Sequence, residues 1–237
     1  MKVIILAGGK GTRISQYTGK IPKPMIRVSN TPMLSHIMRI FKFYGFNEFI
    51  IAGGYKIDVI KKYYKNSKEF KGIKIIFTGK DTMTGGRILK LKKYLKKDKD
   101  FFMTYGDGVA DINLKKLLAF HKKNNKIATI TAVRPPVKFG ELEVKKNFMV
   151  QSFIEKPQTK QGWINGGFFV LNEKVFNYIA KYNTVFEREP LSKLAKINQL
   201  IAYKHSGFWK CMDSLNEKNQ LEKIYKENKN IWKIKSY

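Results

Sequence analysis

Short hydrophobic runs alternate with amphipathic segments along the first half of the chain. The runs cover residues 2–6, 48–52, 73–77, 101–105 and 127–133. Runs of this length are typical of buried strands. Between them, apolar residues recur at helical spacing, as at Leu34, Ile37, Met38 and Phe41, which indicates a helix with one face in the core. Strands that alternate with helices favour a parallel sheet with helical crossovers.

The pattern changes after Phe139, where shorter stretches replace the regular alternation. Strand-like stretches lie near 140–144, 149–155 and 166–170, helices near 173–181 and 188–197, and a further helical pattern covers 215–225. No repeat, low-complexity linker or Pro/Gly/Ser hinge separates the two halves. We therefore predict one α/β domain over residues 1–237, with a Rossmann-like mixed, mostly parallel sheet flanked by helices and a small β-containing part in the second half.

Composition narrows the class of protein. With 237 residues, of which 43% are hydrophobic, the chain can bury a full core. No apolar run approaches the roughly 18–20 residues that a membrane span requires, so we expect a cytoplasmic protein without a membrane partner. The single cysteine, Cys211, excludes an internal disulfide framework and a metal site made of several thiolates.

The net charge of +29 comes almost entirely from lysine. Only six of the 47 basic residues are arginines, whereas proteins that read nucleic acids use arginine widely for bidentate contacts to bases and phosphates. Solvated lysine-rich faces therefore explain the charge better than a nucleic-acid groove, and we expect no nucleic-acid partner. A positive field would still attract polyanionic substrates such as nucleotides.

A glycine-rich loop follows the first predicted strand. It reads Gly8-Gly9-Lys10-Gly11-Thr12-Arg13 and comes directly after Leu6 and Ala7, at the carboxyl edge where α/β sheets bind ligands. Its glycines let backbone N–H groups approach a ligand, and its last two residues add a hydroxyl and a cationic fork suited to phosphate oxygens. Ile14 replaces the third glycine of a dinucleotide fingerprint, and the Walker pattern is absent. A plain glycine turn is the structural alternative.

Two further residues suit the chemistry of phosphates. Lys23 stands between Pro22 and Pro24, which restrict the backbone on both sides and hold the ammonium group rigidly, facing the same phosphates as the loop. Asp107 follows the 101–105 run between two glycines, where its carboxylate can reach the same edge of the sheet. Magnesium prefers such oxygen ligands, although an aspartate between glycines also forms ordinary turns.

Together with several blocks further along, these motifs resemble the sugar-1-phosphate nucleotidyltransferases, and among them the enzymes that use CTP. The blocks are Met83–Arg87, Thr104–Asp111, Glu155–Pro157, Trp163–Val170, Gly207–Trp209 and Met212–Asp213. The resemblance runs nearly end to end. It implies the nucleotidyltransferase fold, in which residues 1–135 form mainly the nucleotide-binding half and residues 136–237 mainly the sugar-phosphate-binding half with the C-terminal helix.

The resemblance also implies roles for individual residues. Arg13 and Lys23 would be the catalytic cations that bind the phosphates, and Asp107 and Asp213 would hold Mg²⁺. The nucleotide would be bound by Leu6, Ala7, Gly8, Gly9, Gly11, Thr12, Arg13, Lys23, Thr82, Arg87 and Gly106. The sugar phosphate would be bound by Glu155, Lys156, Asn165 and Gly166.

Several of these residues also have a plain structural explanation. The alternatives are a helix cap at Asp213, a surface cation at Arg87, an exposed ion pair of Glu155 with Lys156, and a tight turn over residues 165–167. For Arg87 the preceding Gly85-Gly86 pair favours a ligand role, because glycines permit close approach.

The implied reaction transfers a cytidylyl group from CTP to a sugar 1-phosphate. The expected acceptor is α-D-glucose 1-phosphate, and the products are CDP-glucose and pyrophosphate. Such a reaction depends on positioning and charge neutralisation, in keeping with a sequence that has no evident Ser-His-Asp or Cys-His arrangement. Three alternatives stay open: UTP or dTTP as the donor, another phosphorylated acceptor, and a non-catalytic protein that binds nucleotides or nucleic acid.

The chain departs from the family pattern in two places. It is shorter than these relatives between about Lys62 and Thr78, which bears on the homo-oligomer that the resemblance implies. Residues 158–161, Gln-Thr-Lys-Gln, replace a more glycine-rich stretch beside the expected sugar site. The identity of the acceptor is therefore more open than that of the nucleotide.

Overall fold

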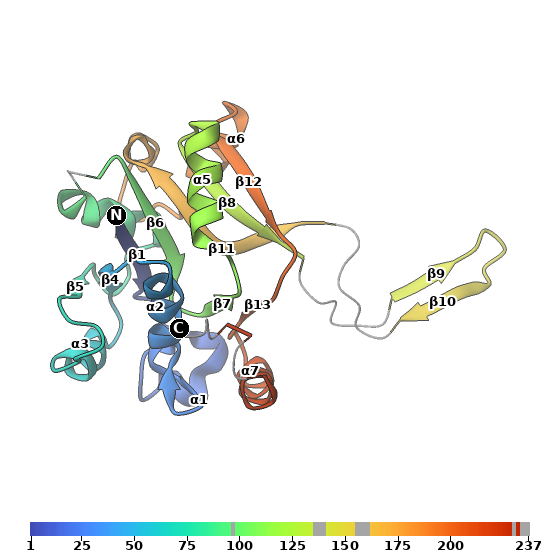
Figure 1. The fold of residues 1–237 in the computed structure, drawn as a ribbon, viewed down its shortest axis with the longest axis horizontal. Coiled ribbons are helices and arrows are strands. Elements are labelled where there is room, and N and C mark those ends of the chain that lie inside the picture. The colour runs from blue at the N-terminus through green and yellow to red at the C-terminus, as the bar shows by residue number, and fades with distance from the viewer. Residues whose placement is uncertain (96–97, 135–140, 155–161, 229–230, 233–237) are drawn as a thin grey trace.

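A computed structural model describes residues 1–95, 98–134, 141–154, 162–228 and 231–232. Within these ranges a seven-stranded central sheet has the order β12-β8-β11-β6-β1-β4-β5 (Figure 1). Its strands are β1 (Lys2–Ala7), β4 (Glu48–Gly53), β5 (Lys74–Phe77), β6 (Asp100–Tyr105), β8 (Ala128–Val133), β11 (Ile164–Asn172) and β12 (Leu200–His205). All neighbouring pairs are parallel except those of β11, which runs antiparallel between β6 and β8. The predicted mixed, mostly parallel sheet is confirmed.

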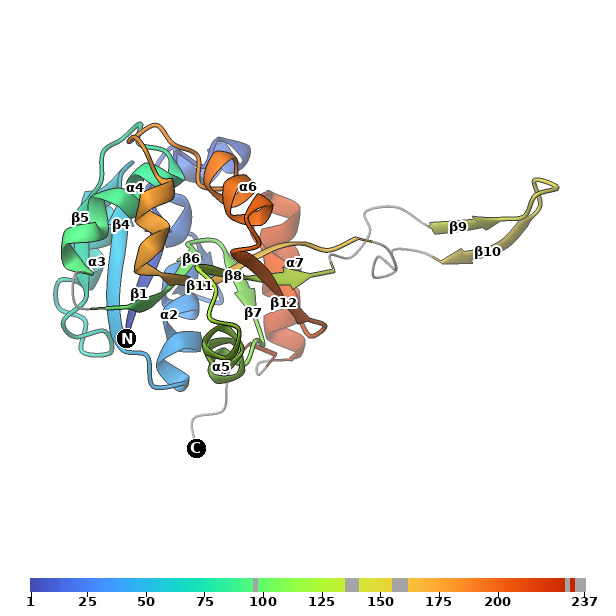
Figure 2. The same ribbon diagram turned by 90° about the horizontal axis from the view of Figure 1, so that it is seen from above.

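Helices cover both faces of the sheet (Figure 2). On one face lie α2 (Met33–Phe43), α3 (Ile57–Tyr64), α5 (Leu114–Asn124) and α7 (Leu215–Glu227); on the other lie α4 (Thr84–Leu91), α6 (Glu189–Lys196) and the 3₁₀ helix η4 (Glu173–Tyr178). Strand β1 serves both layers, because Val3 and Ile5 pack in the first core and Ile4 and Leu6 in the second, as the two-residue period of a strand requires. Shorter helical turns are η1 (Thr12–Ile14), α1 (Ser15–Thr18), η2 (Lys23–Met25) and η3 (Lys92–Tyr94).

Two short antiparallel ladders lie outside the central sheet. One pairs β2 (Arg27–Val28) with β3 (Thr31–Pro32), and the other pairs β7 (Gly108–Ala110) with β13 (Trp209–Cys211). The second ladder is the more consequential for function, because it joins the end of β6 to the start of α7.

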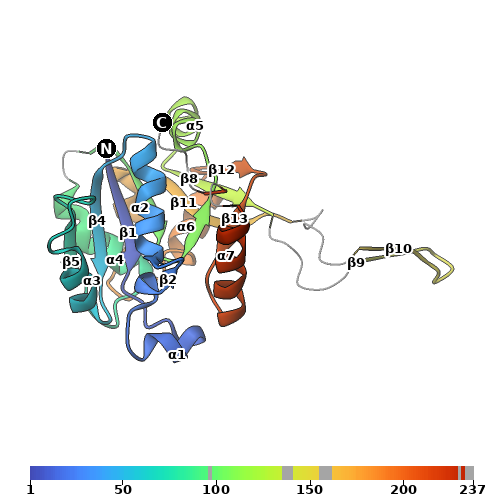
Figure 3. The ribbon, with the colours of Figure 1, turned by 60° about the horizontal axis from the view of Figure 1, so that its bottom comes forward.

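A β-hairpin of β9 (Glu141–Val144) and β10 (Val150–Ile154) lies apart from the central sheet (Figure 3). The predicted strand-like stretches are confirmed over these residues, while the positions that join the hairpin to the sheet lie outside the described ranges. Phe148 and Met149 are exposed at its turn. Among the described helices, none is long and apolar enough to cross a membrane.

The helix predicted near 173–181 is confirmed, but it is a 3₁₀ helix and is shorter than predicted. The chain forms the 3₁₀ helix η4 there, which ends at Tyr178, and its Val175 and Phe176 still pack in the core. The helix predicted near 188–197 is confirmed as α6. Strands β12 and β13 were not predicted, because their side chains are only partly buried and carry no strong apolar run.

Candidate active site at the carboxyl edge of the sheet

The glycine loop after β1 turns back onto the segment that carries Lys23. Gly11 has a left-handed backbone with φ of 64°, a conformation that glycine adopts without strain. A Cβ at this position would lie 2.9 Å from Thr18 Cγ2 and 3.1 Å from Lys23 Cβ. The Thr18 hydroxyl donates a hydrogen bond of 3.1 Å to the Gly11 carbonyl oxygen. The loop is therefore packed directly against the side chain of Lys23.

Glycine at position 106 brings Lys23 to the end of β6. The Gly106 N–H donates to the Leu6 carbonyl oxygen at 3.0 Å, and a Cβ on Gly106 would lie 2.7 Å from Pro24 Cγ. Only a residue without a side chain lets the proline segment lie this close. Lys23 Nζ consequently reaches Asp107 Oδ2 at 2.5 Å.

The β7–β13 ladder brings Asp213 to Asp107 although 106 positions separate them in the sequence. Gly108 pairs with Cys211, and the Met212 N–H then donates to the Asp107 carbonyl oxygen at 2.9 Å. The register of one short ladder thus sets the distance between the two carboxylates.

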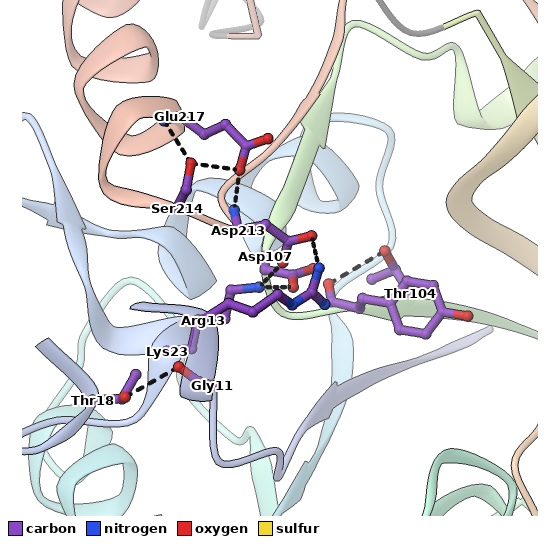
Figure 4. Close-up of polar contacts among 10 residues, drawn as sticks. Gly11, Arg13, Thr18, Lys23, Thr104, Asp107, Asp213, Ser214 and Glu217 are labelled. Atoms are coloured by element: carbon purple, nitrogen blue, oxygen red, sulfur yellow. Dashed lines mark hydrogen bonds and ion pairs between the residues drawn. The ribbon is translucent and has the colours of Figure 1, made fainter. Parts of the chain in front are cut away.

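A capping box fixes the backbone of Asp213. Ser214 is the N-cap of α7, and its Oγ accepts from the Glu217 N–H at 3.2 Å, while Glu217 Oε2 accepts from the Asp213 N–H at 2.7 Å. The alternative that Asp213 itself caps this helix is therefore wrong. Its side chain is directed to the cations instead (Figure 4).

Four charged side chains meet at this point (Figure 4). Lys23 Nζ lies 2.5 Å from oxygens of both Asp107 and Asp213, and Arg13 Nη1 lies 2.7 Å from Asp213 Oδ2. Burial alone would lower the pKa of Lys23, whose side chain is 12% exposed, but the two carboxylates outweigh it and raise that pKa. Lys23 therefore stays charged, and the two aspartates present a cleft that already holds a cation.

Two cavities adjoin this cluster and share Arg13, Tyr105 and Asp107 in their walls. The first, of about 340 Å³, is also lined by Leu6, Ala7, Gly8, Gly9, Gly11, Lys23, Pro24, Thr82, Met83, Thr84, Arg87 and Gly106. The second, of about 390 Å³, is also lined by Thr104, Gly108, Ile164, Asn165, Gly166, Gly167, Phe168, Trp209, Cys211 and Asp213. Two ligands, one in each cavity, would therefore meet beside the charged cluster.

The model of the family described as "Nucleotidyl transferase" matches residues 2–219. The chain belongs to this family. It is 42% identical to glucose-1-phosphate cytidylyltransferase of Salmonella typhimurium, over 98% of this chain and 99% of the relative. It is 41% identical to a probable glucose-1-phosphate cytidylyltransferase of Bacillus subtilis, over 99% and 100% of the two chains. Among solved structures it resembles HddC from Yersinia pseudotuberculosis complexed with GMP-PN, with a TM-score of 0.75, 26% identity, and coverage of 94% of this chain and 99% of that one.

In this nucleotidyltransferase most residues expected to bind the nucleotide line the first cavity. The exception is Thr12, which is exposed on η1 and lines neither cavity. Asn165 and Gly166 line the second cavity, whereas Glu155 and Lys156 lie outside the described residues. Asn165 belongs to strand β11, but the strand is irregular after it: Gly167 has φ of 81° and its N–H donates to Asn165 Oδ1 at 2.8 Å, so the predicted turn at 165–167 is built into the strand.

Arg87 is buried, not a surface cation. Its guanidinium donates to Thr78 Oγ1 at 2.7 Å and to the carbonyl oxygens of Gly79 at 2.8 Å and Gly8 at 2.9 Å. Burial lowers its pKa. A Cβ on Gly8 would lie 2.1 Å from Arg87 Nη1, so Gly8 leaves room for the guanidinium. Arg87 thus shapes the wall of the first cavity by holding two loops together.

Gly85 and Gly86 serve packing, which corrects the expectation that they admit a ligand. A Cβ on Gly86 would lie 2.0 Å from the Tyr182 carbonyl oxygen, and one on Gly85 would lie 2.8 Å from that of Thr184. The glycines let the first turn of α4 pack against the 182–184 loop. They support the cavity wall from behind.

Some residues that line the cavities were not predicted as site residues from the sequence, and Tyr105, which lines both cavities, is the main one. It ends β6, so the same carboxyl-edge rule that selected Asp107 could have selected it. Trp209 also lines the second cavity, and its Nε1–H donates to the Gly166 carbonyl oxygen at 2.7 Å. For Cys211, burial raises the pKa to about 12, which makes it a poor nucleophile at neutral pH.

Proposed function

We propose that this nucleotidyltransferase transfers a cytidylyl group from CTP to a sugar 1-phosphate, with α-D-glucose 1-phosphate as the preferred acceptor. The products are CDP-glucose and pyrophosphate. The observation that carries the proposal is the cluster of Arg13, Lys23, Asp107 and Asp213 at the junction of two cavities. The near full-length identity of 42% to a glucose-1-phosphate cytidylyltransferase supports the choice of substrates.

The two aspartates suit Mg²⁺. Their oxygens already hold the Lys23 ammonium group at 2.5 Å each, and each side chain keeps 28% exposure, which leaves room for water and phosphate ligands. No group of three or more His, Cys, Asp or Glu side chains that could hold a metal ion occurs in the described part of the chain. Magnesium typically needs only one or two carboxylates in addition to substrate phosphates and water. Bound between Asp107 and Asp213, it would neutralise phosphate oxygens as their charge increases.

The chemical step requires orientation more than acid–base catalysis. An oxygen of the sugar phosphate, already ionised at neutral pH, forms a bond to the α-phosphorus of CTP. The bond from that phosphorus to the bridging oxygen breaks, and pyrophosphate leaves with the electron pair. Arg13 and Lys23 would bind the triphosphate on the side of the first cavity, so that charge developing on the leaving group meets fixed cations.

We assign the two substrates to separate cavities. The first begins at the glycine loop and ends at Thr82 and Met83, which suits a nucleoside with its phosphates at the loop. The second is lined by Asn165 and Trp209, an amide and an aromatic ring of the kind that bind sugar hydroxyls and sugar faces.

The test is pyrophosphate release with Mg²⁺, in which CTP, UTP, dTTP and ATP are each combined with glucose 1-phosphate. We expect release with CTP, its loss when the metal is chelated, and a loss of at least about 100-fold in Asp107→Asn. Asp98→Asn is the matched control, because Asp98 pairs with Lys2 away from both cavities. Its activity should equal that of the wild type.

Each other outcome points to a specific alternative. Release with UTP or dTTP at the same efficiency would replace the cytidylyl donor while keeping the reaction. Release with CTP only when another sugar phosphate is added would change the acceptor. Binding of CTP without turnover under any combination would refute the enzymatic proposal in favour of a nucleotide-binding protein.

A further inference from the structure

A chain of hydrogen bonds joins the two cavities behind their walls. Glu187 lies in the segment before α6 and lines neither cavity. Its Oε1 accepts from the Tyr105 hydroxyl, and its Oε2 accepts from the Thr84 hydroxyl at 2.6 Å. Thr84 lines the first cavity and Tyr105 lines both. One half-buried carboxylate is therefore bonded to the walls of both cavities.

The series of hydrogen bonds continues from Tyr105 to the second cavity. Asn165 Nδ2 donates to the Tyr105 hydroxyl oxygen at 3.3 Å, and Asn165 Oδ1 accepts from the Gly167 N–H at 2.8 Å. On the other side, Thr84 Oγ1 accepts from the Phe186 N–H at 2.9 Å. The series of hydrogen bonds thus ends on both sides at a backbone N–H group, which can only donate.

The direction of every bond follows from these two ends. The Thr84 hydroxyl accepts a hydrogen bond from Phe186 and therefore donates its own to Glu187. Asn165 uses its amide oxygen for Gly167 and therefore turns its N–H toward Tyr105. Tyr105 in turn donates the one hydrogen bond of its hydroxyl to Glu187. Burial and the neighbouring carboxylate raise the pKa of Tyr105, which keeps it a donor. A carboxylate, which accepts on both oxygens, is the group that lets both branches end at one residue.

We propose that Glu187 is a positioning residue for the sugar phosphate. Through Tyr105, Glu187 fixes the orientation of the Asn165 amide, so that the N–H groups of Asn165 and not its oxygen are available at the second cavity. Of the two Nδ2 hydrogens, one is used by Tyr105, and the other has no acceptor among the described residues. The second cavity would therefore recognise an oxygen that accepts, from a sugar hydroxyl or from the phosphate. This inference rests on the proposed function and extends it to a residue outside the cavity walls.

Glu187→Gln is the sharpest perturbation, because it keeps the shape of the side chain and replaces one accepting oxygen with a donating amide group. Either Thr84 or Tyr105 would then face a donor. If the Tyr105 branch reverses, the amide of Asn165 must compete with the Gly167 N–H. For Glu187→Gln we expect a KM for glucose 1-phosphate raised by about three- to tenfold, the size of one lost hydrogen bond.

Two further variants separate the branches. Tyr105→Phe removes only the acceptor branch and should raise the KM for glucose 1-phosphate by a similar factor. Thr84→Val removes only the nucleotide branch and should act on the KM for CTP. In the double variant of Tyr105→Phe with Glu187→Gln the effects on the KM for glucose 1-phosphate should not add, because both remove the same path.

Binding of glucose 1-phosphate should also be measured by calorimetry, with a non-hydrolysable CTP analogue and Mg²⁺ present. This readout does not need turnover, so it distinguishes failure of the inference from failure of the proposed function. Weaker binding in Glu187→Gln, with thermal unfolding within about 2 °C of the wild type, supports the inference. An unchanged affinity for glucose 1-phosphate in both Glu187→Gln and Tyr105→Phe, or effects that add in the double variant, would overturn it.

Discussion

Lys23 occupies the place between two carboxylates where a metal ion is expected, so the two cations should compete. Its Nζ lies 2.5 Å from an oxygen of Asp107 and 2.5 Å from one of Asp213. Those two oxygens are therefore no more than twice that distance apart. Lys23→Met keeps most of the length and the apolar stem of the side chain but removes the charge, and leaves the carboxylates facing one another.

The cost can be worked from the geometry. Two like charges at that separation repel by about 3 kcal/mol at an effective dielectric constant of about 20. Each aspartate side chain is 28% exposed, so water reduces the loss of stability to about 1–2 kcal/mol. For a chain of this length that corresponds to a melting temperature lower by about 2–8 °C.

The assay is thermal unfolding with and without about 10 mM Mg²⁺ in the absence of nucleotide. We expect Mg²⁺ to stabilise Lys23→Met more than the wild type, because the ion no longer displaces an ammonium group. Lys193→Met is the control: its ion pair with Glu189 is exposed and remote from the site, so neither stability nor the response to Mg²⁺ should change. An equal response to Mg²⁺ in Lys23→Met and the wild type would refute the idea that both cations share one place.

Three other predictions concern the supports of the site. Gly86→Ala places a methyl group 2.0 Å from a backbone oxygen and should lower the free energy of unfolding, measured in denaturant, by about 1–3 kcal/mol. Gly9→Ala is the control, because nothing lies within 4 Å of its Cβ, and it should cost under about 1 kcal/mol. Equal losses in the two variants would contradict the packing argument. Ser214→Ala and Asn113→Ala each remove a helix N-cap and should each lower the stability by about 1 kcal/mol. Only Ser214→Ala should also weaken the binding of Mg²⁺, measured by titration. Equal metal affinity in the two variants would show that the cap at Ser214 does not position Asp213. The pKa of about 12 predicts that Cys211 reacts slowly with iodoacetamide at pH 7 and that its rate still rises with pH above 9; a rate at pH 7 equal to that of the unfolded chain would contradict the burial argument.

The strands with continuous apolar runs could be predicted from the sequence, because strands covered on both faces have no polar side to disguise them. β1 and β6 are such strands, with buried side chains along almost their whole length. β12 could not, since it lies at the edge of the sheet and its Ala202 and Lys204 are exposed. β13 is three residues long and depends on its pairing with β7.

The candidate site divides in the same way. The glycine loop and Asp107 follow strands that the sequence reveals, so their common edge could be derived. The approach of Asp213 to Asp107 depends on the register of a short ladder, which no local pattern encodes, and only the family resemblance suggested it. Glu187 carried no signal at all, because a charged residue between Phe186 and Arg188 reads as an ordinary surface position.

The reversed direction of β11 has a consequence for how the lining of the second cavity can change. Because this strand runs against its neighbours β6 and β8, the chain enters it at the ligand edge, and Ile164 to Gly166 stand beside the ends of strands that arrive from the opposite side. Changes at Gly162 or Trp163, the described residues just before Ile164, therefore fall next to the second cavity while leaving the glycine loop and the charged cluster untouched. Substitutions at the start of β11 can therefore change the lining of the second cavity without altering the glycine loop that lines the first.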